Sequence, residues 1–199
     1  MHGLINRAIE RFVRDTYGRN IWLEVIEPLD LGYSEFEAMM IYDEAITARV
    51  LARAGEVLER PVPDLLEDIG TYLVSHPNVE ALRRLLRFGG VTFEEFLHQL
   101  DDLPERARLA VSDLCLPQLE LREHSSSSFS LIVRANARGI QGFGYVVMGL
   151  LRAMADDYGA LVTLEHRGSR DGREIVAVHL LETAFAEGRD FKLGAGLTG

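Results

Sequence analysis

A single cysteine, six prolines and the lack of a long apolar run set the first limits on this 199-residue sequence. One cysteine excludes an intrachain disulfide framework and a cysteine-rich zinc site, and it favours a reducing compartment. No window of about 18 consecutive apolar residues exists, so no transmembrane helix is expected. The apolar run at the N-terminus is too short for a signal peptide. The sequence therefore predicts a cytoplasmic protein that does not insert into a membrane.

Basic residues are also scarce. The chain has 21 lysines and arginines against 31 acidic residues, which gives a formal charge of −10. A surface of this sign repels phosphate backbones, so nucleic acid is not an expected partner. Hydrophobic residues make up 47% of the chain, which is enough to build a sizeable core. The length suits one domain, or one domain with two lobes.

Motifs that mark catalytic sites are absent. The sequence contains no Gly-x-Ser-x-Gly, no P-loop and no pair of histidines at zinc-binding spacing. The serine run at 125–128 has no base close to it in the sequence, and the acidic pairs at 94–95 and 156–157 are typical of surfaces. The sequence therefore predicts that this chain is not an enzyme.

Apolar residues recur at helical spacing through the first 113 residues. The expected helices comprise residues 4–17, 20–27, 42–54, 61–73, 79–87, 93–100 and 104–113. Thr92 is expected to cap the helix at 93–100, with Glu95 three residues later as its partner. Pro28 ends the second helix, and Pro63 lies in a first turn, where proline is tolerated. This half of the chain is therefore expected to be helical.

Beyond residue 114 the apolar residues alternate instead, as they do in half-buried strands. Strands are expected around 119–121 and at 129–133, 161–165 and 175–181, with one helix at 142–158. Turns are expected at 125–128 and 168–172. The pattern predicts an α+β fold, in which a helical N-terminal part (1–113) precedes a mixed C-terminal part with an antiparallel sheet (114–183). Residues 184–199 are expected to form a tail.

The run from Phe93 to Pro104 is the most informative segment. Its Leu100-Asp101-Asp102-Leu103 closely resembles the Leu-Asp-x-Leu that precedes the haem-ligating histidine of the haem-nitric oxide/oxygen binding family (H-NOX or HNOB). Shorter similarities follow in the family's order, namely Met1-x-Gly3, Tyr17-Gly18, Tyr42-Asp43-Glu44, Ile69-Gly70, Leu85-Leu86-Arg87-Phe88-Gly89-Gly90 and Val147-Met148-Gly149-Leu150-Leu151. The resemblance spans residues 1–183 and implies an H-NOX-like fold.

The resemblance also implies a pocket, a cofactor and partners. The cofactor would be haem, and the residues expected to line its pocket are Ile5, Ile9, Leu73, Pro117, Val146 and Leu150. Pro117 matches a proline that presses on the haem. Val146 holds the distal position at which oxygen-binding members have a tyrosine, so stable oxygen binding is not expected. The partner would be a signalling enzyme such as a histidine kinase or a cyclic-dinucleotide or nucleotide cyclase.

Two departures from the family pattern concern the haem itself. Pro104 occupies the slot of the ligating histidine, and proline has no side-chain donor atom. It also suits the first turn of a helix. The family's Tyr-x-Ser-x-Arg triplet, which holds the haem propionates, is not intact in any of three possible registers. One register places Arg134, Asn136 and Arg138 there, and such arginines can meet an anionic head group.

Other side chains offer only weak substitutes for the missing iron ligand. His2 and His76 are the alternatives that could approach the pocket from the opposite side. His98 is expected to face solvent, since it lies about 240° around a helix from position 104. Cys115 is expected to be a buried packing residue. No metal site is therefore predicted.

These observations predict a stand-alone H-NOX-like sensory or regulatory domain that lacks conventional five-coordinate haem. Its pocket would hold another apolar ligand, and a carboxylate on that ligand would lie near Arg134 or Arg138. One alternative is a haem-based nitric oxide sensor with altered ligation through His2 or His76. Another is a ligand-free interaction module whose cavity has filled with side chains.

Overall fold

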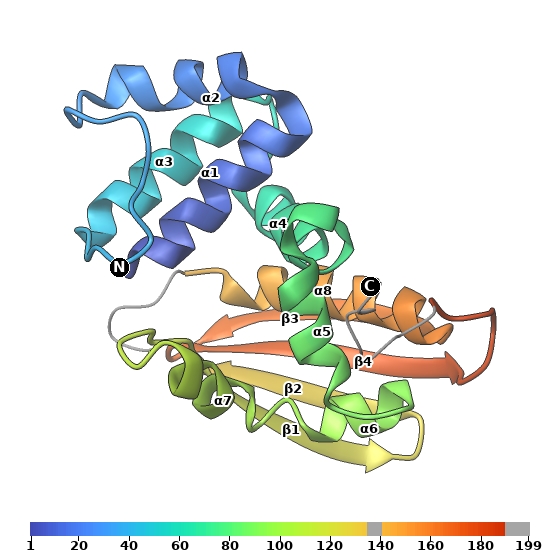
Figure 1. The fold of residues 1–199 in the computed structure, drawn as a ribbon. Helices are drawn as coiled ribbons and strands as arrows, with labels where there is room; N and C mark the ends of the chain where they lie inside the picture. The colour runs from blue at the N-terminus through green and yellow to red at the C-terminus, as the bar shows by residue number, and fades with distance from the viewer. Residues whose placement is uncertain (135–140, 190–199) are drawn as a thin grey trace, which may run out of the picture.

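The computed structural model describes residues 1–134 and 141–189. An upper, helical lobe is built from the N-terminal third of the chain (Figure 1). Its elements are α1 (Gly3–Tyr17), α2 (Arg19–Ile26), the short 3-10 helix η1 (Glu27–Leu29), α3 (Glu44–Val57) and α4 (Val62–Ser75). The predicted helices of this part are confirmed, because side chains at helical spacing bury one face of each helix in a shared core.

Three short helices lead from this lobe down to the sheet (Figure 1). They are α5 (Glu80–Arg87), α6 (Phe93–His98) and α7 (Leu103–Ala110), and a 3-10 turn, η2 (Pro77–Val79), precedes them. The predicted cap of α6 is present, since the Thr92 hydroxyl accepts a hydrogen bond from the Glu95 amide at 3.2 Å. The Glu95 carboxylate reaches the Val91 amide, one residue before the cap.

The lower lobe is a four-stranded antiparallel sheet with one long helix against it (Figure 1). The strands are β1 (Gln118–Ser125), β2 (Ser128–Arg134), β3 (Leu161–Arg170) and β4 (Arg173–Glu182), in the order β1-β2-β4-β3. Helix α8 (Phe143–Tyr158) connects β2 to β3 and packs against the sheet. The predicted α+β class, with a helical N-terminal part and an antiparallel sheet, is confirmed.

Side chains of the strands alternate between two faces of the sheet. Leu131 and Val176 are cross-strand partners in the core, together with residues of α8. Their neighbours Ile132 and Ile175 pair with each other on the opposite, outer face. This alternation decides which residues of β1 and β2 can reach the interior.

Helices α4 and α8 join the two lobes where two glycines meet. A methyl group added to Gly149 would lie 1.8 Å from the Glu67 carbonyl oxygen, and one added to Gly70 would lie 2.0 Å from the Val146 carbonyl oxygen. The two backbones are therefore in direct contact. The Thr71 hydroxyl also lies 3.3 Å from the Gly149 carbonyl oxygen, as donor to it.

Some boundaries differ from those expected. Helix α7 ends at Ala110 instead of residue 113, because Val111 leaves the helical conformation and a turn follows, in which the Leu114 amide donates to the Val111 carbonyl oxygen. Strands β3 and β4 are longer than expected and are joined by the two-residue turn Asp171-Gly172, both at positive φ. Turns of this kind match the twist of paired strands. In the tail, residues 185–189 hydrogen-bond to the end of α8, and residues 190–199 lie outside the described part. The boundary at residue 184 stays a prediction.

Within residues 1–134 and 141–189, none of the helices combines the length and the apolar composition that a membrane span requires.

Candidate functional site

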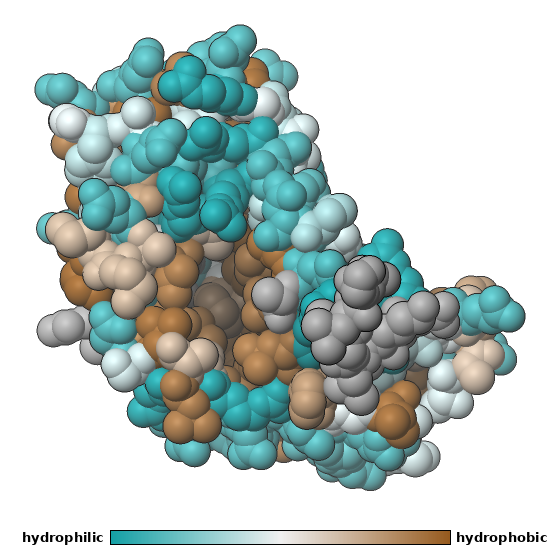
Figure 2. All heavy atoms as spheres, viewed as in Figure 1, coloured by the Kyte–Doolittle hydropathy of each residue, from teal (hydrophilic) through white to brown (hydrophobic). Residues whose placement is uncertain are grey.

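A cavity of about 320 Å³ lies between the helical lobe and the sheet lobe. Figure 2 shows that this face of the molecule is hollowed between the lobes, with hydrophobic residues gathered around the hollow. Helices α1, α4, α5, α7 and α8 contribute to its walls, together with the start of β1. The described residues that line it are Leu4, Ile5, Ala8, Ile9, Leu66, Ile69, Leu73, Leu82, Leu85, Leu86, Leu100, Leu103, Pro104, Ala107, Ala110, Val111, Leu114, Leu116, Pro117, Leu119, Phe143, Val146, Val147 and Leu150.

The fold brings the predicted pocket residues together in this one cavity. These are Ile5 and Ile9 from α1, Leu73 from α4, Val146 and Leu150 from α8, and Pro117 from the segment before β1. They come from parts of the chain that are more than 100 residues apart in sequence, and the crossing of α4 over α8 places them opposite one another. That they contact a ligand stays a prediction.

The lining has a uniform chemistry. Every described residue in it is aliphatic, proline or phenylalanine, so none of them offers a side-chain nitrogen, oxygen or sulfur atom. Haem iron in proteins is held by histidine, cysteine, methionine or tyrosine. Pro104 itself is buried in the first turn of α7 and faces the cavity. The described walls can therefore exclude water and contact an apolar molecule, but they cannot coordinate a metal.

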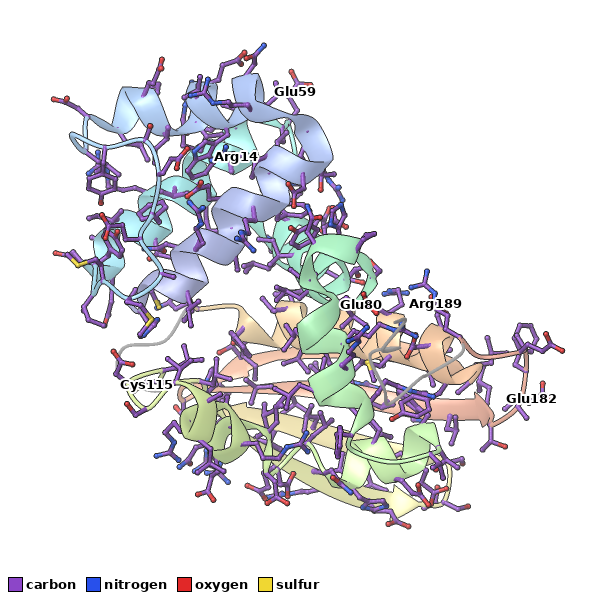
Figure 3. All side chains as sticks on the ribbon, viewed as in Figure 1. Arg14, Glu59, Glu80, Cys115, Glu182 and Arg189 are labelled. Carbon is purple, nitrogen blue, oxygen red and sulfur yellow. The ribbon has the colours of Figure 1, made fainter. Side chains whose placement is uncertain are left out.

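Residues 111–117, the mouth strap, connect α7 to β1 along one side of the cavity. Val111, Leu114, Leu116 and Pro117 line the cavity, whereas Cys115 is exposed. The expectation that Cys115 is buried is therefore wrong, because Leu114 and Leu116 face the cavity and the residue between them points outward. In Figure 3, Cys115 lies on this connection, beyond the end of α7.

The mouth strap contacts the start of α1 through a polar pair. His2 is buried and caps α1, with its Nδ1 atom accepting a hydrogen bond from the Leu4 amide at 3.1 Å. Since Nδ1 is the acceptor, a neutral ring carries its proton on Nε2, which lies 3.3 Å from the Asp113 Oδ1 atom. His2 thus lies close to the strap, although its Nε2 atom makes no hydrogen bond there, and it is not among the described residues that line the cavity.

The other histidines weighed as ligands also lie elsewhere. His76 ends α4, where its Nδ1 accepts from the Asn78 amide and its ring lies 4.8 Å from that of Tyr72. His98 is exposed, as expected, and lies 3.6 Å from a carboxylate oxygen of Glu123. Neither of them lines the cavity in the described part of the chain.

Arg134 does not reach the cavity. Val133 belongs to the core, so the next residue of β2 points to the outer face of the sheet, where Arg134 pairs with Glu120 of β1. Hydrogen bonds from Arg134 and then Arg122 lower the pKa of Glu120. The other two predicted anion contacts, Asn136 and Arg138, lie outside the described residues. Anion binding by this set stays a prediction.

A polar cleft of about 390 Å³ adjoins the cavity, and the two share the lining residues Pro104 and Leu119. Its polar walls are Asp101, Glu105, Arg108, Gln118, Glu120 and Arg134. Sequence reasoning missed Glu120 and Arg108. The signal for Glu120 was the pairing of β1 with β2, which places Glu120 opposite Ile132 and Gln118 opposite Arg134, but that register is not visible in the sequence alone.

Comparison with known proteins places this arrangement in a family. The family model described as Haem-NO-binding matches residues 2–166. The chain belongs to the haem-NO-binding family. Its fold is that of H-NOX proteins: the unliganded Fe(II) H-NOX protein from K. algicida superposes with a TM-score of 0.78 at 15% identity, over 94% of this chain and 100% of that one. The H-NOX triple mutant from S. oneidensis superposes with a TM-score of 0.76 at 17% identity, over 92% of this chain and 97% of that one.

Curated relatives of this H-NOX domain are much longer proteins. It is 27% identical over 157 residues to the soluble guanylate cyclase gcy-31 of Caenorhabditis elegans, which covers 79% of this chain and 22% of that protein. It is 28% identical over 105 residues to gcy-35 of the same organism, which covers 52% of this chain and 15% of that protein. The chain therefore spans about a fifth of the length of gcy-31.

Sequence reasoning also missed a charged cluster in the helical lobe of the domain. The Glu10 carboxylate is fully buried and lies 2.9 Å from Arg7 and 2.8 Å from Arg14, while it accepts the Phe36 amide at 2.8 Å. The spacing of these residues on α1 was visible, since they are three and four positions apart. Their burial was not, because the segment at 33–37 that covers them has no periodic pattern. The cluster joins α1 to the segment at 33–37, and its residues are not among the described ones that line the cavity.

Proposed function

We propose that this H-NOX domain is a sensory or regulatory module whose cavity holds an apolar ligand in place of an axially ligated haem. One observation carries the proposal: the described walls of the cavity contain no side chain able to ligate iron, and Pro104 lies where the family resemblance expects the histidine. The residues present therefore do not fit a conventionally ligated haem. They do fit a molecule that gains from leaving water, as apolar pockets generally do.

The position of the cavity suggests how binding is reported. Its walls come from both lobes, so a ligand inside it contacts α1 and α4 on one side and α7 and α8 on the other. A ligand that fits one lobe arrangement better than another shifts the population toward it, by at most its difference in affinity for the two. To change the ratio of the two lobe arrangements from 1:99 to 99:1, the ligand must bind one arrangement more favourably than the other by about 5.5 kcal/mol.

The molecule that responds would be a signalling enzyme. The relatives gcy-31 and gcy-35 are soluble guanylate cyclases, which favours a nucleotide cyclase as the partner or as the attached domain. A histidine kinase or cyclic-dinucleotide cyclase is the other kind of partner that the family resemblance implies. The domain would act on this enzyme and not catalyse a reaction itself. A cytoplasmic location agrees with the exposed, unpaired Cys115.

The proposal is tested by the visible spectrum of the purified protein after addition of haem. We expect no sharp Soret band of five-coordinate haem from the wild type. A sharp band that disappears in His76→Ala or His2→Ala would overturn the proposal in favour of altered ligation. Native mass spectrometry of fresh preparations is expected to show an added small mass, and a bare chain in every preparation would favour a ligand-free module.

A variant makes the role of position 104 directly testable. Pro104→His places an imidazole on the wall of the cavity, so we expect it to gain a Soret band that the wild type lacks. Pro104→Ala is the matched control, because it removes the proline without supplying a ligand. Failure of Pro104→His to bind haem while it stays folded by circular dichroism would show that position 104 is not the ligand position.

A further inference from the structure

We infer that the ligand of this cavity is an uncharged, hydrocarbon-like molecule without a carboxylate or other ionised group. The inference rests on the proposed function, since it names the chemical class that the same cavity accepts. Its first support is the lining. A carboxylate taken from water into surroundings without hydrogen-bond donors is strongly disfavoured, and the described walls provide only carbon atoms from side chains. A hydrocarbon makes no hydrogen bonds to water, so it gives up none when it enters the cavity.

The second support is the charge distribution beside the cavity. The polar cleft that shares Pro104 and Leu119 with it is where a head group would emerge. Its carboxylates come from Asp101, Glu105 and Glu120, against the guanidinium groups of Arg108 and Arg134. Both arginines already face carboxylates: Arg134 pairs with Glu120, and Arg108 lies 3.7 Å from Glu105. An incoming anion would compete with these pairs in a cleft of negative formal charge.

The third support is the match between size and chemistry. The cavity has a volume of about 320 Å³. An engineered cavity of about 150 Å³ lined by Leu, Ile and Phe in another protein stays dry and binds benzene. This cavity has roughly twice that volume, so it suits a molecule of about two fused rings or a chain of about ten carbons. Such a molecule can fill the space between the lobes without exposing a polar group to the walls.

The experiment compares two probes of the same shape and different charge. Naphthalene and 2-naphthoate are titrated into the full chain at neutral pH, and dissociation constants are measured by calorimetry. We expect naphthalene to bind at least about tenfold more tightly, because only the naphthoate carries a charge into the apolar walls. As the pH falls and naphthoate becomes protonated, the two affinities should approach each other.

Variants show whether the probe occupies this cavity. Ala8→Phe fills space from the wall of α1 and is expected to abolish naphthalene binding. Ala48→Phe makes the same change at an exposed position of α3 outside the cavity, and it should bind as the wild type does. Circular dichroism checks that both variants are folded.

The possible results separate this inference from the proposed function. A naphthoate affinity within tenfold of naphthalene, or above it, overturns the inference while the cavity remains a ligand site; loss of that affinity in Arg134→Gln or Arg108→Gln would identify a carboxylate-bearing ligand. Binding of neither probe overturns both the inference and the ligand-binding role of the cavity. Naphthalene binding that Ala8→Phe leaves unchanged also overturns the inference, because the probe then lies elsewhere.

Discussion

Asp15, on α1, faces the end of α4, where it accepts hydrogen bonds from the Tyr72 hydroxyl at 2.5 Å and the Asn78 side-chain amide at 2.9 Å. Burial raises the pKa of Asp15, but these two hydrogen bonds together with nearby positive charge outweigh it, so the pKa lies below its ordinary value. In return, burial and the bond to Asp15 raise the pKa of Tyr72. The contact joins α1 to the end of α4, and both of these helices line the cavity.

The lowered pKa of Asp15 predicts the pH dependence of an Asn variant. Because the folded-state pKa is below the unfolded one, the carboxylate stabilises the fold above the unfolded value of about 3.9 and loses this effect as the pH falls through the folded value. Asp15→Asn should lower the free energy of unfolding by roughly 1 kcal/mol at neutral pH. In urea titrations across pH 3–7, the difference in free energy of unfolding between Asp15→Asn and the wild type should become smaller only below about pH 4. A difference in free energy of unfolding that does not change with pH would contradict this account.

At the scale of elements, the glycine pair Gly70 and Gly149 sets the distance between α4 and α8. Any side chain at this crossing would push the helices apart and change the shape of the cavity that both of them line. The contact is a backbone contact, so no rotamer change can relieve an added methyl group.

Gly149→Ala is therefore expected to destabilise the protein by at least about 1–3 kcal/mol, the range for overpacked cores. The measurement is urea unfolding followed by circular dichroism. Gly89→Ala is the matched control, since its new methyl group would lie 3.0 Å from its nearest neighbour instead of 1.8 Å. If both variants lose the same free energy of unfolding, the crossing of α4 and α8 tolerates a side chain.

The mouth strap is the second element-scale feature with a measurable consequence. Asp113→Ala removes the contact with His2, and we expect amide hydrogen exchange within residues 111–117 to become severalfold faster. His2→Asn should have the same effect, because asparagine keeps the cap of α1 but is too short to reach Asp113. Glu182→Ala, at the far end of the sheet (Figure 3), is the control. Unchanged exchange in both strap variants would refute the link.

Helices were predictable from sequence because periodicity and caps are local, as Thr92 and Glu95 illustrate. The cavity residues were named from the family resemblance, since periodicity alone shows only that Ile5 or Leu150 is apolar, not that they face each other. The position of Arg134 was not predictable, because it depends on strand register and on the face to which β2 turns it. The exposure of Cys115 likewise depends on the path of the strap between two lobes.

At the scale of the whole molecule, the cavity couples ligand binding to stability. A ligand that binds only the folded state stabilises it by about 2.7 kcal/mol at a concentration of 100 times Kd. Naphthalene should therefore raise the Tm of the wild type in a concentration-dependent way. Ala8→Phe, whose cavity is filled, should show no such rise. A Tm shift of the same size in both proteins would mean that the effect does not arise in the cavity.

The exposed thiol of Cys115 makes the strap accessible to spectroscopy without further engineering. It is the sole cysteine of the chain, so a maleimide dye or a spin label attached to native protein would mark a single position. That position lies between two residues of the cavity wall, Leu114 and Leu116. Emission or mobility of the label would then report changes in the surroundings of the strap when a ligand enters the cavity, in the unmodified sequence.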